Sequence, residues 1–225
     1  MKYYHFMIFL MLISIEISVL KAQPAEGKSD PKATTILNKL KKQYSSYKTV
    51  KADFSMVLEV PERPKTNSKG QLFQQGQKYR ISLPELTSFS DSKSVWTYLT
   101  KNKEIQLTNA GDKESSPFIS PQELISMYEK KDMVYTISGE ATINNKKCTE
   151  IEFKPVNNKT DYFKIRMSVD TKASQLVQAK VFYKDGSRYS FVINKLLINK
   201  PLDSKLFTYN SNEWPGLHVE DLRLD

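Results

Sequence analysis

The chain has 225 residues and a formal net charge of +9, a length that suits one good-sized domain or two small ones. A basic surface favours acidic partners such as anionic lipid head groups, acidic proteins or nucleic acid, although it also fits an ordinary soluble surface. Cys148 is the only cysteine, which excludes an intramolecular disulfide and a metal site built from cysteines. We expect it to be a small buried residue in a strand.

The N-terminus has the pattern of a secretory signal peptide. Lys2 supplies a short basic region, and residues 6–20 are apolar apart from two serines and one glutamate. This run is shorter than the ~20 residues that cross a bilayer as a helix, so a cleaved signal fits it better than a permanent anchor. We therefore predict a signal peptide over residues 1–22 and an exported single domain over residues 23–225. Export argues against nucleic acid as a partner.

An amphipathic helix is predicted at the start of the exported domain. Asp30 can cap the helix, and Pro31 fits its first position. Apolar residues then recur on one helical face. These residues are Ile36, Leu37, Leu40, Tyr44 and Tyr47. We expect a helix over about residues 31–46.

From about residue 50 the apolar period changes from 3.6 to 2, which is typical of strands. Short strands and loops follow, and a second series of strands begins near residue 133. The pair Asp185-Gly186 marks a tight hairpin turn. The sequence shows no repeat and no linker between domains. About ten short strands at this spacing predict one antiparallel sheet that is curved or closed.

A second, short helix is predicted between the two series of strands. Ser120 and Glu123 have the spacing of a capping box. Leu124, Ile125 and Tyr128 then share one face of a helix of barely three turns. Only two helices are thus available to cover a wide curved sheet. If the short one can lift, the inner face of the sheet becomes a cavity for an apolar ligand.

Motifs for catalysis and metal binding are missing from the sequence. His218 is the only histidine of the predicted mature chain, so a pair of histidine ligands is excluded. It lies in a polar tail near the C-terminus, which argues against a Ser-His-Asp triad. No GxSxG elbow or glycine-rich phosphate loop is present. We expect neither an enzyme nor a cofactor.

Several segments, weak singly, form a fairly specific pattern in their order and spacing. They are residues 50–55 (VKADFS), 69–72 (KGQL), 79–81 (YRI), 90–98 (SDSKSVWTY), 120–125 (SPQELI), 148–155 (CTEIEFKP), 184–186 (KDG), 206–207 (LF) and 215–223. In this pattern the chain resembles the LolA-type periplasmic carriers of outer-membrane lipoproteins, over most of its predicted mature part. The resemblance implies an α+β, mainly antiparallel fold: a strongly curved, half-open β-barrel closed by short helices.

The resemblance also implies a function. The cavity would receive the acyl chains of a lipoprotein released by an inner-membrane transporter, and a monomeric carrier would take it across the periplasm to an outer-membrane receptor. Two positions depart from the family. Ser92 stands where the family usually has Gly, and Gln75-Gly76 stand where the best-studied carriers have Arg-Pro. In the family that Arg ties the lid to the barrel, so this lid would close without it, and another lipid is an alternative cargo.

Candidate site residues follow from the strand pattern and the resemblance. For the lipid-binding cavity we predict Phe54, Met56, Leu58, Phe73, Tyr79, Ile81, Trp96, Tyr98 and Ile105. For the lid helix we predict Phe118, Leu124, Ile125 and Tyr128. For any one of these residues, permanent core is an equally good interpretation. Trp96 and Tyr98 share a face, but alternation alone does not say which face is the inner one. We expect Arg80 to point outward, where it could contribute to a basic docking surface.

A different class of function remains open for the same fold. A lipid-sensing or regulatory module would use such a sheet to bind a protein or a mislocalised lipoprotein as a signal. Relatives of that kind generally carry an extra domain. Lipid or lipoprotein that is recovered with the purified protein would favour the carrier.

Overall fold

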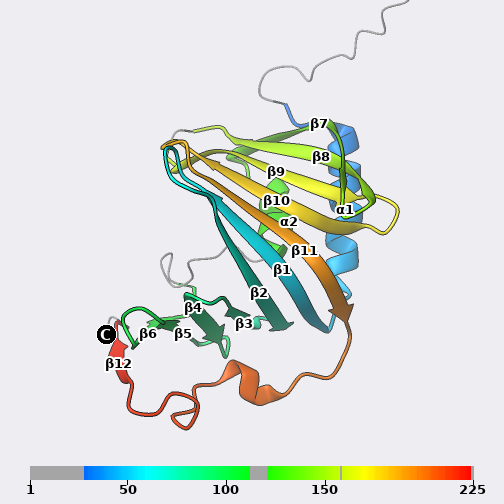
Figure 1. Cartoon of the computed structure of the whole chain (residues 1–225). Coiled ribbons are helices and arrows are strands. Elements are labelled where there is room, and N and C mark those ends of the chain that lie inside the picture. Colours follow the sequence, from blue (N-terminus) through cyan, green and yellow to red (C-terminus); the bar gives the residue numbers. More distant parts are fainter. Residues whose placement is uncertain (1–27, 112–120, 158, 224–225) are drawn as a thin grey trace, which may run out of the picture.

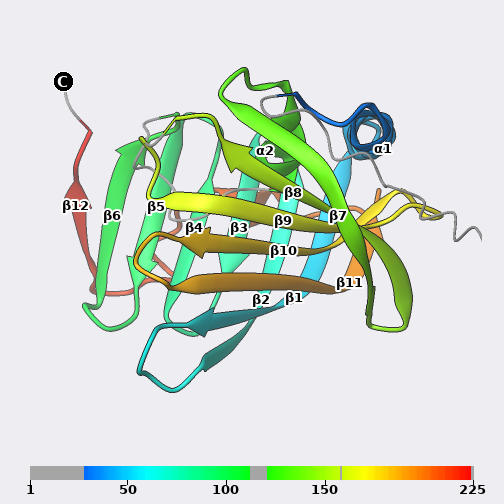
Figure 2. The ribbon, with the colours of Figure 1, turned by 90° about the horizontal axis from the view of Figure 1, so that it is seen from above.

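One twelve-stranded sheet forms the body of the protein and bends round two helices without closing (Figure 1). The computed structural model describes residues 28–111, 121–157 and 159–223. The predicted signal peptide and Phe118 therefore lie outside the described residues. In Figure 2, β9 and β10 pass in front of β3 and β4, so the sheet folds over itself. The predicted half-open, mainly antiparallel architecture is confirmed.

The strand order is β12-β6-β5-β4-β3-β2-β1-β11-β10-β9-β8-β7, and every neighbouring pair is antiparallel except β12 and β6. The strands are β1 (Thr49–Glu59), β2 (Thr66–Gln75), β3 (Lys78–Ser82), β4 (Leu86–Ser90), β5 (Ser94–Leu99), β6 (Glu104–Asn109), β7 (Met133–Ile143), β8 (Lys146–Pro155), β9 (Tyr162–Asp170), β10 (Gln175–Tyr183), β11 (Arg188–Ile198) and β12 (His218–Asp221). Register shifts in the pairs β1–β11, β9–β10 and β7–β8 mark bulges. Bulges bend a strand and increase its twist, which lets the sheet wrap.

The two helices lie close to the positions predicted from the sequence. Helix α1 (Pro31–Ser45) is capped by the Asp30 side chain, which accepts a hydrogen bond from the Lys32 amide. Helix α2 (Pro121–Ser126) is shorter than expected, because its last turn tightens into the 3₁₀ segment η1 (Met127–Glu129). A second 3₁₀ segment, η2 (Ser204–Phe207), follows the long strands.

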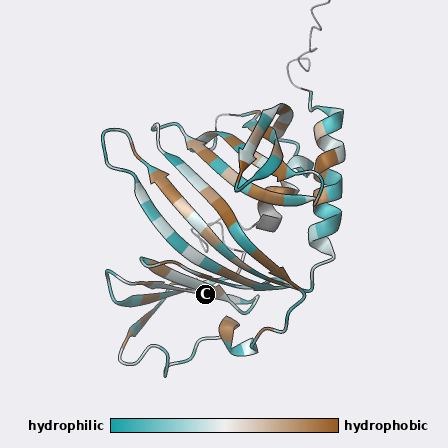
Figure 3. Ribbon diagram, turned by 45° about the vertical axis from the view of Figure 1, so that its right-hand side comes forward, coloured by the Kyte–Doolittle hydropathy of each residue, from teal (hydrophilic) through white to brown (hydrophobic). Residues whose placement is uncertain are grey.

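Apolar and polar residues alternate along the strands (Figure 3), and the inner face of the sheet divides into two cores. The covered core lies where α1 and α2 pack on β7–β10, and the open core lies on β1–β3 and β11. In the covered core, Ile151, Phe153 and Met167 have no exposed surface. The open core is built around Phe54, Met56, Leu72, Ile81 and Leu83.

The outer face of β3–β6 also buries apolar side chains, beneath the C-terminal segment. Trp214 stacks on Phe89 and contacts Tyr98. Arg80 lies over both Phe89 and Trp214 and is ion-paired with Glu213. Arg80 thus points away from the inner face, as expected, but the C-terminal segment covers it rather than leaving it free for docking.

Two turns show how the chain departs from the family pattern. Ser92 adopts a φ of +83°, a left-handed conformation that favours glycine. The turn is held by Asp91, whose carboxylate accepts hydrogen bonds from the amides of Lys93 and Ser94. Gly76 lies between β2 and β3 with a φ of +59°, and the Gln74 side chain donates to its carbonyl.

Candidate functional site

An apolar cavity of about 220 Å³ lies between the covered core and the open core. Its walls come from α1, α2, β1, β2, β3, β10 and β11. The lining residues are Tyr44, Val50, Ala52, Phe54, Leu72, Ile81, Leu124, Leu176, Gln178, Ala179, Val181, Tyr183, Tyr189, Phe191, Ile193 and Leu196. None of these residues carries a charge. The cavity therefore suits an apolar ligand with few polar groups.

The lining of the cavity extends along one strand. Its lining along β11 runs from Tyr189 to Leu196, seven residues apart, which corresponds to roughly 20 Å of strand. The cavity of about 220 Å³ is thus lined along the length of β11, and we refer to it as the slot. Such a shape fits a flexible aliphatic chain better than a compact ring system.

One side of the slot is only partly covered. Phe191, Ile193 and Leu196 face the cavity from β11 and are half-buried, whereas β9 and β10 residues such as Met167 and Val181 are buried. The difference arises because α1 and α2 pack mainly over β7–β10. Apolar surface is thus left accessible in the slot, a state that ligand binding would relieve.

The short helix α2 forms the cap of this cavity. Leu124 lines the cavity and is buried, and Ile125 is buried against the covered core. Tyr128 packs against the same core and forms an edge-to-face contact with Tyr135. Three of the four predicted lid residues thus lie together on one apolar face of α2 and η1.

Two polar contacts hold the cap to α1. The Tyr128 hydroxyl donates to the Asn38 side chain at 2.7 Å. Lys41 is ion-paired with Glu129 at 2.5 Å between Nζ and Oε1, and the hydrogen bond from Lys41 to that carboxylate raises the pKa of Lys41. Both pairs are largely exposed, so each contributes little to stability. Solvent can easily replace these two polar contacts, so the buried residues Leu124 and Ile125 contribute most to holding the cap.

Among the residues predicted for the cavity, Phe54 and Ile81 line it. Met56 and Leu58 share the inner face of β1 with Phe54, but they lie further along the strand and do not line the cavity. Tyr79 shares a face with Ile81 and packs against the open core. Met56 and Tyr79 therefore support the wall of the cavity rather than form it. Leu58 lies on the same face beyond the cavity.

Four residues predicted for the cavity lie on the opposite face of the sheet, and the prediction is corrected for them. They are Phe73, Trp96, Tyr98 and Ile105. Leu72 lines the cavity, so its neighbour Phe73 points outward, where Lys51 lies over its ring. Trp96 stacks on Phe89 in the outer layer, and Tyr98 pairs with Ile105 across the β5–β6 ladder. Alternation fixes which residues share a face but not which face turns inward.

The sequence prediction missed the largest wall of the cavity, which β10 and β11 form. The lining residues from these two strands are Leu176, Gln178, Ala179, Val181, Tyr183, Tyr189, Phe191, Ile193 and Leu196. Their alternation around the hairpin at Asp185-Gly186 was a readable signal. It could not show that β11 pairs with β1, which brings residues from the two ends of the domain together.

Residues 28–111, 121–157 and 159–223 contain no cluster of three His, Cys, Asp or Glu residues that could hold a metal ion. His218 is exposed on β12, and its nearest charged partner is Glu220. Among the described residues there is also no helix with the length and apolarity that crossing a membrane requires.

Comparison with solved structures supports the fold. The chain is similar to an uncharacterised conserved protein from Thermus thermophilus, with a TM-score of 0.54 and 9% identity over 84% of this chain and 99% of that one. Weaker similarity is found to LprF from Mycobacterium bovis, with a TM-score of 0.48, 14% identity, and 78% and 97% coverage. A LolA superfamily protein from Nitrosomonas europaea gives a TM-score of 0.41, 10% identity, and 79% and 97% coverage.

Comparison by sequence identifies the family. No curated protein matches the chain as a whole sequence. The family model described as outer membrane lipoprotein carrier protein LolA matches residues 45–210, a stretch that holds every strand of the cavity wall and the cap helix α2. The chain therefore belongs to the LolA family.

Proposed function

We propose that this protein is a periplasmic carrier that binds the acyl chains of lipoproteins in the slot between its two cores and moves them from the inner to the outer membrane. The observation that carries the proposal is the uncharged slot of about 220 Å³ beneath the short helix α2. The family supports lipoprotein as the cargo. The signal-like N-terminus, with its apolar residues 6–20, supports export.

The size of the slot requires the cap to move when cargo binds. Typical ligand pockets have volumes of ~300–1000 Å³, whereas this slot has about 220 Å³. Displacing Leu124 and its neighbours would join the slot to the space that α2 occupies. Burial of the two apolar cap residues Leu124 and Ile125 is worth ~1.5–3 kcal/mol each, so the closed cap is a moderate competitor for the cargo.

That competition makes handover possible. Burying an acyl chain is worth ~0.8 kcal/mol per CH₂, and several complete chains would nominally exceed the practical limit of affinity, roughly −18 to −21 kcal/mol. A carrier must bind less tightly than that in order to release its cargo. Closure of α2 over an emptied slot offsets part of the binding energy.

The experiment is recovery of lipid with the purified protein after expression in a host grown with labelled fatty acids. The wild type should carry labelled lipid or lipoprotein, and the Leu124→Arg variant should carry much less, because a charge on the cap cannot be buried beside acyl chains. Leu222→Arg is the matched control, since Leu222 is exposed near the C-terminus. Release of lipoproteins from spheroplasts by the added protein tests transport directly.

The outcomes separate the possible cargoes. Labelled lipoprotein on the wild type, together with release from spheroplasts, supports the proposal. Labelled lipid without protein would point to a carrier of another lipid. A wild type that is free of lipid and inactive in release would contradict the proposal.

A further inference from the structure

One residue that lines the slot has a buried hydroxyl without a hydrogen-bond acceptor. Tyr44 is 3% exposed and lines the cavity from the last turn of α1. The backbone amide of Leu176 approaches the hydroxyl oxygen as a donor, but no acceptor for the O–H proton is found among the described residues. Burial raises the pKa of Tyr44, and the nearby Tyr47 raises it further, while the Leu176 amide opposes the shift. The group is therefore a neutral hydroxyl that can donate a hydrogen bond.

Packing alone does not account for this hydroxyl. A buried polar group without a partner is destabilising, and a phenylalanine would fill the same space without that cost. The polar groups that act on the hydroxyl are the Leu176 amide and the Tyr47 phenol, and neither is a carbonyl or carboxylate acceptor. The slot is lined at this end by the apolar Val50, Leu176 and Leu196.

The position of Tyr44 gives the slot a direction. Tyr44 lies beside Leu176, which is at the start of β10. The tyrosines Tyr183 and Tyr189 line the other end, seven residues further along β10 and at the start of β11. The stretch between them is formed by residues such as Ala179 and Ile193 and is almost entirely apolar.

We propose that the Tyr44 hydroxyl donates a hydrogen bond to the carbonyl oxygen of a bound acyl group, so that the site selects esters or amides of fatty acids over plain hydrocarbon. The acyl tail then runs along β11 towards Tyr189. This assignment rests on the proposed carrier function, and it adds the chemical class and orientation of the ligand. A carbonyl oxygen is an acceptor, which is the partner that the unpaired hydroxyl needs.

The test compares two probes with the same number of carbons, a saturated fatty acid methyl ester and the corresponding alkane. Both are delivered from cyclodextrin to delipidated full-length protein, and calorimetry measures their binding. The Tyr44→Phe variant should bind the ester about three- to tenfold more weakly than the wild type, the usual effect of one hydrogen bond. Its affinity for the alkane should be unchanged, and its melting temperature should be equal or higher.

Tyr47→Phe is the matched control. Tyr47 lies one turn further on, its ring centroid is 5.1 Å from that of Tyr44, and its hydroxyl is also buried and unpartnered, but it does not line the slot. This variant should bind both probes as the wild type does. Equal loss of ester and alkane binding in Tyr44→Phe, or no loss of either, overturns the assignment alone. A wild type that binds neither probe overturns the proposed function as well.

Discussion

The covered and open cores are built from the same kinds of residue on one continuous sheet, yet they are buried to different extents. On β7–β10 the inner residues Phe153 and Ile165 have no exposed surface, whereas Phe191 and Ile193 on β11 are half-buried. Helices α1 and α2 make this difference, because they pack on one half of the sheet only. The slot therefore arises because the helices cover the sheet incompletely.

The largest expected effect tests this comparison directly. Phe153→Ala in the covered core should lower the free energy of unfolding by ~3–5 kcal/mol, since it leaves a cavity that cannot collapse. Phe191→Ala in the slot should cost roughly half as much, because its ring is already partly exposed. Urea denaturation of both delipidated variants measures the difference. Equal losses would mean that the slot is packed as tightly as the covered core.

The second prediction concerns the wall of the open core. A Cβ atom at Gly70 would lie 2.4 Å from Cζ of Phe54 and 2.7 Å from the carbonyl oxygen of Ser82. Gly70→Ala should therefore lower the free energy of unfolding by about 1–3 kcal/mol and, by displacing the Phe54 ring, weaken lipid binding.

Gly139→Ala is the control for Gly70→Ala, because no heavy atom lies within 4 Å of the added methyl group. In thermal denaturation, the melting temperature of the Gly139 variant should be close to that of the wild type. If the Gly70 variant is as stable as the Gly139 variant, the strands β1 and β3 can move apart without a loss of stability. The wall of the open core would then deform more easily than the structure indicates.

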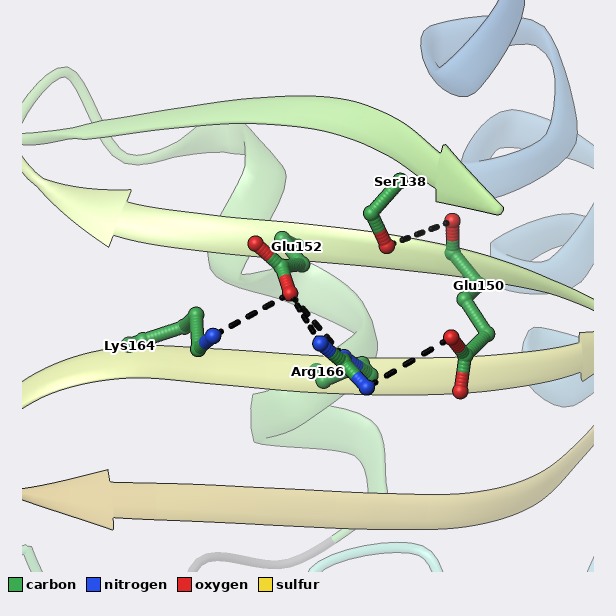
Figure 4. A network of polar contacts seen from close by, with 5 residues as sticks. All are labelled: Ser138, Glu150, Glu152, Lys164 and Arg166. Carbon is green, nitrogen blue, oxygen red and sulfur yellow. Dashed lines mark hydrogen bonds and ion pairs between the residues drawn. The ribbon is translucent and has the colours of Figure 1, made fainter. Parts of the chain in front are cut away.

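The third prediction concerns the outer face of the covered half. Glu152 on β8 accepts hydrogen bonds from Arg166 and lies 3.2 Å from the ammonium group of Lys164, while Arg166 also reaches Glu150 (Figure 4). Burial alone would raise the pKa of Glu152, but the hydrogen bonds from these two cations outweigh it and leave the pKa lowered.

Since the pKa of Glu152 is lower in the folded state, its carboxylate stabilises the fold above the ordinary Glu pKa of about 4.3, and this contribution is lost as the pH falls through the folded value. Glu152→Gln should lower the free energy of unfolding by roughly 1–2 kcal/mol at pH 7. This difference in stability between variant and wild type should become smaller as the pH is lowered. The exposed Glu140→Gln is the control. A difference in stability between the Glu152 variant and the wild type that does not change with pH would contradict the role of the ion pairs.

The smallest effect is expected in the turn between β4 and β5, far along the sheet from both helices. Ser92 holds a φ of +83°, which costs a non-glycine residue energy that glycine avoids. Ser92→Gly should raise the free energy of unfolding by about 0.5–1 kcal/mol. Asn145→Gly, at a φ of +60°, should raise the free energy of unfolding by less, because asparagine tolerates this conformation. A destabilised Ser92→Gly would show that the serine side chain holds the turn.

Local pattern was enough to predict much of this protein from its sequence. Three features depend only on residues a few positions apart, so the sequence determines them. They are the N-terminal capping of α1 by Asp30, the change of apolar period near residue 50 and the hairpin turn at Asp185-Gly186. The outline of α2, with Leu124 and Ile125 on its apolar face, followed for the same reason. The order of the motifs then gave the family and the half-open fold.

Only the tertiary structure decided which face of each strand turns inward. The alternation that placed Phe54 and Ile81 in the slot also placed Phe73 and Trp96 there, although these point to the outer face. Side-chain parity is a property of one strand, whereas the inner face is set by the path of the whole sheet. The pairing of β1 with β11 and the packing of the C-terminal Trp214 over Phe89 join residues more than 100 positions apart, and no local period records such contacts.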